Sequence, residues 1–379
     1  MKGQWIGTYQ GSVVGNIMVN IDELEDHYAA VAYVNPTDRN IPSSVAYLDT
    51  KNKDLEQKMV AAINPVDPRT GFQCKWEEIK DLYAEGISHS DKSDVTFRLE
   101  DGKLHIDSTS DIGVELSSVL TKPPEKNESK ILGHKMSWDE FKSYISGLSK
   151  SKYLFRGQKK PWKLRTSFHR RGRYRISEFT NKDVKQLHKR LSAITSHYFD
   201  LSIPEQNGSF FNLIQHHGYP TPLLDWTYSP YVSAFFAFRD WPIGYSGEEN
   251  NRIYMFNNDV WQENYSQIQS LDPPYPHLSV IDFIALDNPR LVPQQSVTTA
   301  TNVDDIEAYV LEKERTSSIQ YLQAIDIPAT ERDVAMRDLR FMGITAGSMF
   351  PSIDGVCEEL RECNFDNCYY KPEANIGDC

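Results

Sequence analysis

The sequence predicts an α+β protein in which a small antiparallel β barrel or sandwich precedes a mixed α/β domain. Two observations lead to this prediction. Short runs of alternating apolar and polar residues, separated by glycine turns, dominate residues 1–122. After a polar stretch that contains prolines, helical and strand patterns are mixed. We therefore expect a β-rich domain at 1–122, a linker at 123–132 and a second domain at 133–379.

The strands of the first domain are recognised by their alternation. Apolar and polar residues alternate from Ile17 to Ile21, as a half-buried strand requires. The same pattern over 95–99 continues at Leu104 and Ile106 after Asp101–Gly102, a dipeptide typical of tight hairpin turns. Residues 75–84 are expected to form one short helix.

The second domain opens after the polar stretch 122–130, whose composition predicts a linker. Ser137–Glu140 has the spacing of a capping box, and apolar residues at helical spacing follow it. Thr330–Asp333 repeats this spacing and predicts the start of a last helix. The other expected elements are strands at 153–155, 252–256, 280–285 and 320–325, and helices at 181–199 and 230–239.

The composition suits an ordinary soluble protein, with 25% charged and 39% apolar residues. The net charge of −12 argues against wholesale wrapping by nucleic acid and against a polybasic membrane tether. No apolar run approaches the roughly 20 residues of a membrane span, and the N-terminal sequence lacks the apolar core of a signal peptide. We expect a cytoplasmic protein without a membrane partner.

The five cysteines are unevenly placed. Cys74 stands alone, and the others follow near the end as Cys357, Cys363, Cys368 and Cys379. An odd count without an export signal speaks against a disulfide framework. The spacing also lacks the close cysteine pairs of most structural zinc sites, so we expect reduced thiols and no metal.

Arg156 lies in the most informative peptide, 152–158. Three apolar residues precede it, which predicts a position at a strand end, and Gly157 would let the backbone approach whatever the arginine holds. The planar guanidinium suits paired phosphate or carboxylate oxygens. The alternative is a structural arginine that bridges strand and loop, and the local peptide alone slightly favours it.

A second constellation surrounds Asp225. The acid follows an apolar leucine pair and precedes Thr227 and Ser229, either of which can cap the expected helix. An acid, a hydroxyl and a helix N-terminus together make a polar spot with a positive dipole end. His216 and His217 lie just upstream. Adjacent histidines point in different directions, which favours one buried, hydrogen-bonded ring over a shared metal.

Local basic charge is the third signal. Residues 150–190 contain fifteen lysines and arginines against two acidic residues, a net charge of +13. Trp162, Phe168 and Tyr174 interleave with these charges, a composition typical of surfaces that bind phosphates and stack bases. The alternatives are a basic face docked on the protein's own acidic surface or on an acidic partner. The predicted nucleic-acid contacts are Lys159, Lys160, Lys163, Arg165, Arg170, Arg171 and Arg173.

These motifs closely resemble the FRG domain over roughly residues 137–365. The resemblance rests on motifs in the expected order and spacing. They are Phe155–Gly157, the run from His216 to Phe238, and the closing segments 343–345, 349–351 and 354–355. The FRG pattern in turn resembles, more distantly, the ADP-ribosyltransferase fold. There a strand-end arginine contacts NAD, a hydroxyl-bearing segment precedes a helix, and a late strand supplies a glutamate.

The resemblance implies roles for individual residues. The late strand would be 290–295, with Gln294 in the place of the glutamate, whereas Ser296 and Thr298 depart from the glycine and phenylalanine of the family. Glu307, Glu312 and Glu314 follow nearby as other sources of a carboxylate. The implied catalytic residues are Arg156, Asp225 and Gln294. The implied NAD contacts are Arg156, Gly157, Gln158, Thr227 and Ser229.

The expected function is therefore an NAD-dependent ADP-ribosyltransferase with NAD as substrate and RNA or DNA as acceptor. Fold-level analogy suggests a toxin-like or phage-defence effector with a neutralising partner protein. A carboxylate would stabilise the positive charge that develops on the ribose better than an amide does. The alternative is a non-catalytic module that binds nucleotide, nucleic acid or protein, with Arg156 and Asp225 in a buried salt bridge. A nuclease would require an acidic cluster, and no convincing one is present.

Overall fold

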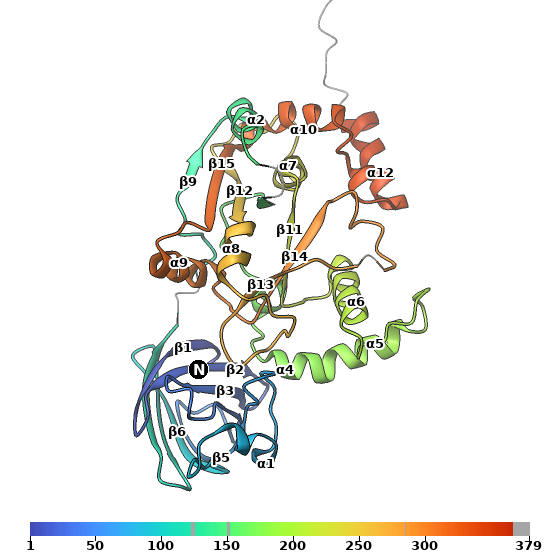
Figure 1. Ribbon diagram of the computed structural model, residues 1–379. Helices are drawn as coiled ribbons and strands as arrows, with labels where there is room; N and C mark the ends of the chain where they lie inside the picture. The colour runs from blue at the N-terminus through green and yellow to red at the C-terminus, as the bar shows by residue number, and fades with distance from the viewer. Residues whose placement is uncertain (123–125, 150–151, 285, 367–379) are drawn as a thin grey trace, which may run out of the picture.

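Two β sheets organise the chain in the computed structural model, which describes residues 1–122, 126–149, 152–284 and 286–366 (Figure 1). The first eight strands form a closed barrel, and the remaining seven form one mixed sheet. The α+β prediction is confirmed, and the first sheet is a barrel rather than a sandwich. The predicted linker begins with residues 123–125, which lie outside the described residues.

Each barrel strand is antiparallel to its neighbours, and the first strand closes on the eighth. Trp5, Val19, Phe97 and Leu104 are buried in the core of the barrel. The strands are β1 (Gly3–Gly11), β2 (Gly15–Glu23), β3 (Tyr28–Pro36), β4 (Ser44–Asp49), β5 (Glu56–Pro65), β6 (Lys92–Glu100), β7 (Lys103–Ser110) and β8 (Glu115–Thr121).

The hairpin turn predicted at Asp101–Gly102 joins β6 and β7. Both residues have positive φ, 50° and 73°, as a tight hairpin turn of this kind requires. The helix expected at 75–84 is shorter than predicted and consists of α1 (Trp76–Ile79) and the 3₁₀ turn η1 (Lys80–Leu82).

The mixed sheet has the strand order β13-β14-β11-β10-β12-β15-β9, and only the last pair is parallel. Leu154 and Phe155 point to opposite faces, because side chains alternate along a strand. Each is buried in a different apolar cluster, so both faces of the sheet are covered. The strands are β9 (Gly133–Lys135), β10 (Tyr153–Gln158), β11 (Leu223–Thr227), β12 (Asn250–Asn257), β13 (Leu278–Ile281), β14 (Ser296–Thr301) and β15 (Leu322–Pro328).

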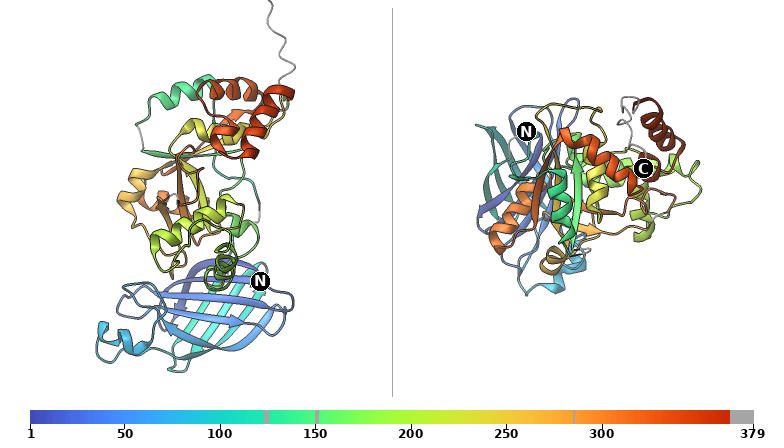
Figure 2. Two further views of the ribbon diagram at one scale, coloured as in Figure 1. Left: turned by 90° about the vertical axis from the view of Figure 1, so that its right-hand side faces the viewer. Right: turned by 90° about the horizontal axis from the view of Figure 1, so that it is seen from above.

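Helices cover both faces of this sheet. Helices α2 (Trp138–Ser146), α7 (Pro230–Phe238) and α10 (Arg332–Phe341) cover one face. Helices α8 (Asn258–Asn264) and α9 (Ile306–Ser317) cover the other. The C-terminal helices lie at the end away from the barrel (Figure 2). The remaining helices are α3 (Ser167–Arg170), α4 (Ile176–Glu178), η2 (Phe179–Val184), α5 (Lys185–Leu191), α6 (Pro204–His216), η3 (Ala329–Glu331), α11 (Ala346–Met349), α12 (Ile353–Arg361) and η4 (Glu362–Asp366). Within the described ranges, no helix combines the length and apolarity that a membrane crossing needs.

Helix caps show where local sequence signals hold. Ser137 forms the predicted capping box with Glu140 at the start of α2, and Ser229 accepts the N–H of Val232 to cap α7. The cap predicted at Thr330 is wrong, because α10 begins at Arg332 after η3 and has no side-chain cap. The helices α11 and α12 follow it, so α10 is not the last helix.

Two further elements differ from the prediction. The helix expected at 181–199 ends at Leu191, and the hydroxyls of Ser192 and Thr195 donate to main-chain oxygens four residues earlier. The late strand expected at 290–295 is a turn, and β14 starts at Ser296. Pro293 lacks the N–H that a strand ladder uses, and Gln295 closes the turn with a φ of 46°.

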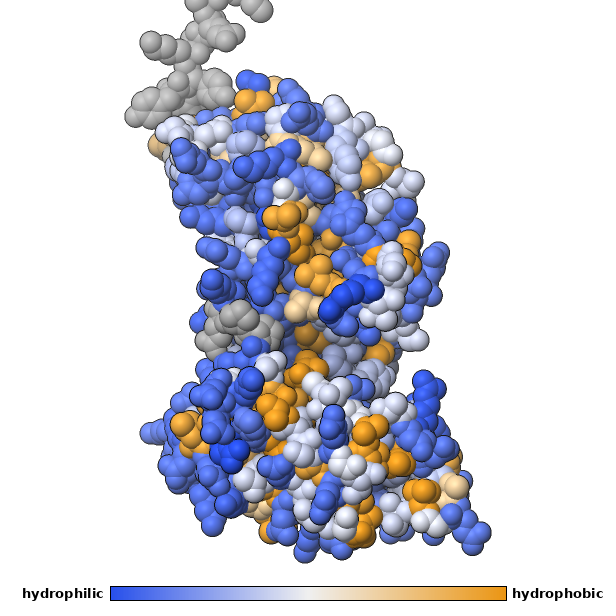
Figure 3. All heavy atoms as spheres, turned by 90° about the vertical axis from the view of Figure 1, so that its left-hand side faces the viewer, coloured by the Kyte–Doolittle hydropathy of each residue, from blue (hydrophilic) through white to orange (hydrophobic). Residues whose placement is uncertain are grey.

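The barrel contacts the second domain through buried polar groups. The amide of Gln4 donates to the main-chain oxygen of Asn302 at 2.6 Å, and its oxygen accepts the N–H of Asp304. Asp22, which is 2% exposed, binds the guanidinium of Arg173 and accepts the N–H of Tyr174 at 2.6 Å. The molecule narrows where the domains meet, and apolar side chains lie in small groups on that face (Figure 3).

Candidate functional site

A cavity of about 510 Å³ opens beside Arg156 on the mixed sheet. Four parts of the chain build it: β10, the segment around α3, the loop after α6, and β11. We call it the arginine cavity. Its lining consists of Arg156, Ser167, Arg170, Arg171, Gln215, Gly218, Tyr219, Pro220, Leu223, Leu224 and Asp225.

Arg156 lies within β10 and pairs with Tyr254 of β12, so the prediction of a strand end is wrong. The ladder continues through Gly157 and Gln158. Nη1 of Arg156 donates to the main-chain oxygen of Asp225 at 2.6 Å, and Nε is shielded from solvent without a hydrogen bond in the described part of the chain. Burial lowers the pKa of this guanidinium to about 10, against the opposing charge of Asp225. Because Arg156 also lines the cavity, an incoming anion would meet a buried cation there.

Arg170 and Arg171 follow on the exposed side of the same cavity. Thr166 positions them, since its side chain caps α3. Burial lowers the pKa of Arg170, and the charge of Arg165 lowers it further. Three guanidinium groups around one space strongly favour an anionic ligand, and their planar geometry suits phosphate oxygens.

Asp225 places one carboxylate among these arginines. Its Oδ1 accepts the amide N–H of Gln215 at 2.5 Å, and Oε1 of that glutamine accepts the hydroxyl of Thr221 at 2.5 Å. This chain fixes the carboxylate at the cavity wall. Arg156 binds the main chain of Asp225 rather than its carboxylate, so the salt bridge expected for a non-catalytic module is not formed.

The other residues expected to bind NAD have structural roles. A Cβ on Gly157 would lie 1.8 Å from the main-chain oxygen of Ser233, so this glycine lets β10 pack against α7 rather than approach a ligand. Gln158 pairs with β12 in the sheet. The hydroxyl of Thr227 donates to the main-chain oxygen of Gln294, and Ser229 caps α7. These residues are absent from the cavity lining.

The carboxylate sources considered for the late strand also lie elsewhere. The amide of Gln294 donates to the main-chain oxygen of Met349 at 2.8 Å. Glu307 is 2% exposed and accepts hydrogen bonds from Tyr254 and from the N–H of Leu164. Glu314 binds backbone N–H groups at the start of β15, and Glu312 contacts Arg315 on the surface. None of these four belongs to the lining of the arginine cavity, which the described residues form.

Most of the predicted nucleic-acid contacts bind the protein itself. Lys159 donates to a main-chain oxygen and lies over the ring of Trp241. The ion pairs are Lys160–Glu249, Lys163–Asp305, Arg165–Asp304, and Arg173 with both Asp22 and Asp183. This pattern favours the alternative of a basic segment docked on the protein's own acidic surface. Arg170 and Arg171 are exposed at the cavity.

The histidines and cysteines show no shared site. His216 is half-buried and contacts Asn288, as expected for a hydrogen-bonded ring, and His217 is exposed. Cys74, Cys357 and Cys363 are free thiols, and the last two cysteines lie outside the described residues. Within the described ranges, no group of three or more His, Cys, Asp or Glu side chains could hold a metal ion.

Three of the lining residues with polar side chains were not anticipated from the sequence. Gln215, Ser167 and Tyr219 reach the cavity from the end of α6, from α3 and from the loop after α6. The available signal was a polar Gln215 in an otherwise apolar run that leads to Asp225. Its role depends on the approach of α6 to β11, which no local pattern specifies.

Comparison with known proteins identifies the segment that holds the cavity. The family model of the FRG domain matches residues 151–242, and every residue of the cavity lining falls within this range. A comparison with curated proteins gives no match. Residues 151–242 are thus similar to the FRG domain, and the arginine cavity lies within the matched segment.

Proposed function

We propose that the protein is an NAD-dependent ADP-ribosyltransferase that binds the diphosphate of NAD in the arginine cavity. The observation that carries the proposal is the convergence of three arginines and one carboxylate on a space of about 510 Å³. This volume lies in the range of small-molecule sites. The arginines match a diphosphate, and a carboxylate matches the positive charge that develops on a ribose during glycosidic cleavage.

Arg156 binds the diphosphate in this proposal, and Arg170 and Arg171 hold it from the exposed side. The bond between the ribose and nicotinamide breaks, and nicotinamide leaves with the bonding electrons. A lone pair of the acceptor forms the new bond to the ribose, and the acceptor proton passes to solvent water. Asp225 stabilises the cationic ribose, a role for which Gln294 lies in the wrong place.

The acceptor is proposed to be a nucleic acid that approaches over Arg170 and Arg171. Trp162, which is 44% exposed, offers a stacking surface on the same segment of the chain. A transferase of this kind would suit growth inhibition or defence against phage, with a neutralising partner protein. This setting rests on analogy at the level of the fold.

A nucleotide-binding module without turnover is the second candidate. The observation that favours it is the engagement of Gln294 and Glu307 in hydrogen bonds within the fold. Asp225 is then the lone carboxylate that the lining offers to a ribose. In the transferase the charge of Asp225 stabilises the cationic ribose, whereas in the binding module this charge supports no turnover.

Labelled NAD, incubated with total RNA and cell extract, separates the two candidates. The wild type should transfer label, and Arg156→Ala should lower both transfer and the NAD-induced rise in Tm by removing the buried cation. Asp225→Asn should lower kcat about 100-fold and leave the NAD-induced rise in Tm at least as large, because a negative charge beside the diphosphate is lost. Arg98→Ala, on the barrel surface, is the control.

Two results would decide against the transferase. Label transfer that survives Arg156→Ala would remove the arginine cavity from the reaction. An NAD-induced rise in Tm with no transfer by the wild type would leave the binding module. Circular dichroism of each variant excludes misfolding as the cause.

A further inference from the structure

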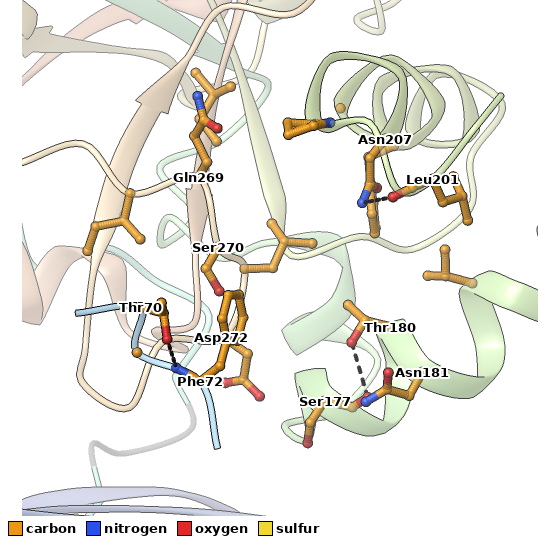
Figure 4. Close-up of a pocket in the computed structure, with 18 of the residues that line it drawn as sticks. Thr70, Phe72, Ser177, Thr180, Asn181, Leu201, Asn207, Gln269, Ser270 and Asp272 are labelled. Carbon is orange, nitrogen blue, oxygen red and sulfur yellow. Dashed lines mark hydrogen bonds between the residues drawn. The ribbon is translucent and has the colours of Figure 1, made fainter. Parts of the chain in front are cut away.

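A second cavity, of about 960 Å³, lies between the barrel and the second domain. We call it the interdomain cavity. Thr70 and Phe72 reach it from a barrel loop, Ser270 and Asp272 lie on a second wall, and helical residues such as Asn181 face them (Figure 4). Neither domain forms this space alone.

Five aromatic side chains belong to the lining of this cavity. They come from both domains, and Phe72 is 60% exposed at its edge. Aromatic faces around a space of this size favour a flat ring, which stacks on them. The aromatic residues in the lining are Tyr33, Tyr47, Phe72, Phe211 and Phe283.

Asp272 supplies a hydrogen-bond acceptor in the same cavity. The hydroxyl of Tyr33 donates to its Oδ2 at 2.7 Å. Its Oδ1 is shielded from solvent, and Ser177 contacts the same carboxylate with its backbone N–H and its hydroxyl, which favours the ionised form. Burial raises the pKa of this carboxyl to about 6, so the group is ionised at neutral pH although it lies away from solvent. A ligand N–H that takes the place of the Ser177 hydroxyl would donate to this carboxylate.

The charge of the lining selects against phosphates. Glu205, Asp272 and Asp282 face a single lysine, Lys185. The arginine cavity has the opposite balance, with three arginines and one carboxylate. An anionic nucleotide therefore suits the arginine cavity, whereas an uncharged or cationic ring compound suits the interdomain cavity.

We propose that the interdomain cavity binds an uncharged or cationic heteroaromatic compound of nucleoside size. The ring stacks on Phe72 and its aromatic neighbours, and an N–H edge donates to Asp272. Leu223 lines this cavity and the arginine cavity alike, so the bound compound lies directly behind the nucleotide site. The proposal does not depend on the transferase reaction, because binding here needs no turnover of NAD.

Calorimetric titration of the full chain with adenosine, guanosine and cytidine, and with their 5′-monophosphates, tests the proposal. At least one nucleoside should bind with a Kd below about 1 mM, and its monophosphate should bind about tenfold more weakly. Phe72→Ala and Asp272→Asn should each weaken nucleoside binding about tenfold, through lost stacking and a lost charged acceptor. Phe341→Ala, at an 84% exposed phenylalanine outside the lining, should bind like the wild type.

Each alternative outcome overturns the proposal. It fails if none of the nucleosides binds, if the monophosphate binds more tightly than the nucleoside, or if both cavity variants bind like the wild type. Phe72 is largely exposed, so its variant should keep the wild-type Tm and report on binding alone. These results are independent of label transfer from NAD.

Discussion

Arg156 and Asp272 are ionisable residues that burial pushes toward their neutral forms. The pKa of Arg156 falls to about 10 and that of Asp272 rises to about 6, in both cases chiefly through burial. Each side chain lines a cavity, and Nε of Arg156 has no hydrogen bond in the described part of the chain. Charges held at a cost to stability beside open space are typical of binding sites.

The pKa of Asp272 leads to a prediction about pH. Its unfolded-state pKa is near 3.8, and its folded-state pKa is about 6. The unfolded chain loses this proton first, so the contribution of Asp272 to stability falls as pH rises from about 4 to about 6. The full cost, about 3 kcal/mol, applies above that range. Asp272→Asn should therefore gain stability relative to the wild type between pH 4.5 and 7.5, measured by urea unfolding. A difference that stays constant between these pH values would contradict the assignment.

Among the elements, β10 and α7 depend on one glycine. A methyl group at Gly157 would collide with the main-chain oxygen of Ser233, and backbone atoms cannot rotate away as a side chain does. Gly157→Ala should therefore lower the free energy of unfolding by about 2–3 kcal/mol, measured by urea unfolding. Gly147→Ala is a matched control, since its methyl group would lie 3.6 Å from the nearest atom. Equal stability of the two variants would show that β10 shifts freely against α7.

Local signals predicted elements whose determinants lie within a few residues. The capping box at Ser137, the cap at Ser229 and the turn at Asp101–Gly102 depend on neighbouring backbone groups, and all three are present. A local signal failed where a contact with a distant part of the chain competes with it. Thr330 has a suitable spacing, but its neighbour Glu331 accepts the backbone N–H of Trp138 in another helix.

The candidate site was predicted in part for the same reason. Arg156 and Asp225 could be singled out because each follows an apolar strand sequence. The structure places Gln215 and Arg170 beside them by packing α6 and α3 against β11, and these contacts span tens of residues. The sequence does not distinguish the two roles of Gly157, because close approach to a helix and close approach to a ligand both require a glycine.

At the scale of the whole molecule, Asp22 ties the barrel to the segment that carries the exposed cavity arginines. Asp22→Asn should lower the free energy of unfolding by about 1–2 kcal/mol, because it removes the buried one of the two carboxylates that pair with Arg173. It should also weaken nucleotide binding at the arginine cavity, since Arg170 and Arg171 lie on the released segment. Thermal unfolding with and without NAD measures both effects.

Asp26→Asn is the control for this prediction, because Asp26 lies close to Asp22 in the sequence but is exposed and contacts His27. A wild-type response to NAD in Asp22→Asn would show that the barrel has no influence on the site.

Leu223, which is 2% exposed, belongs to the lining of both cavities. A compound that presses this side chain toward one cavity narrows that cavity and widens the other. Binding at the two cavities is then reciprocally linked, so that each ligand changes the affinity for the other by the same factor. A compound bound against the barrel would thus change the affinity of the arginine cavity for its ligand.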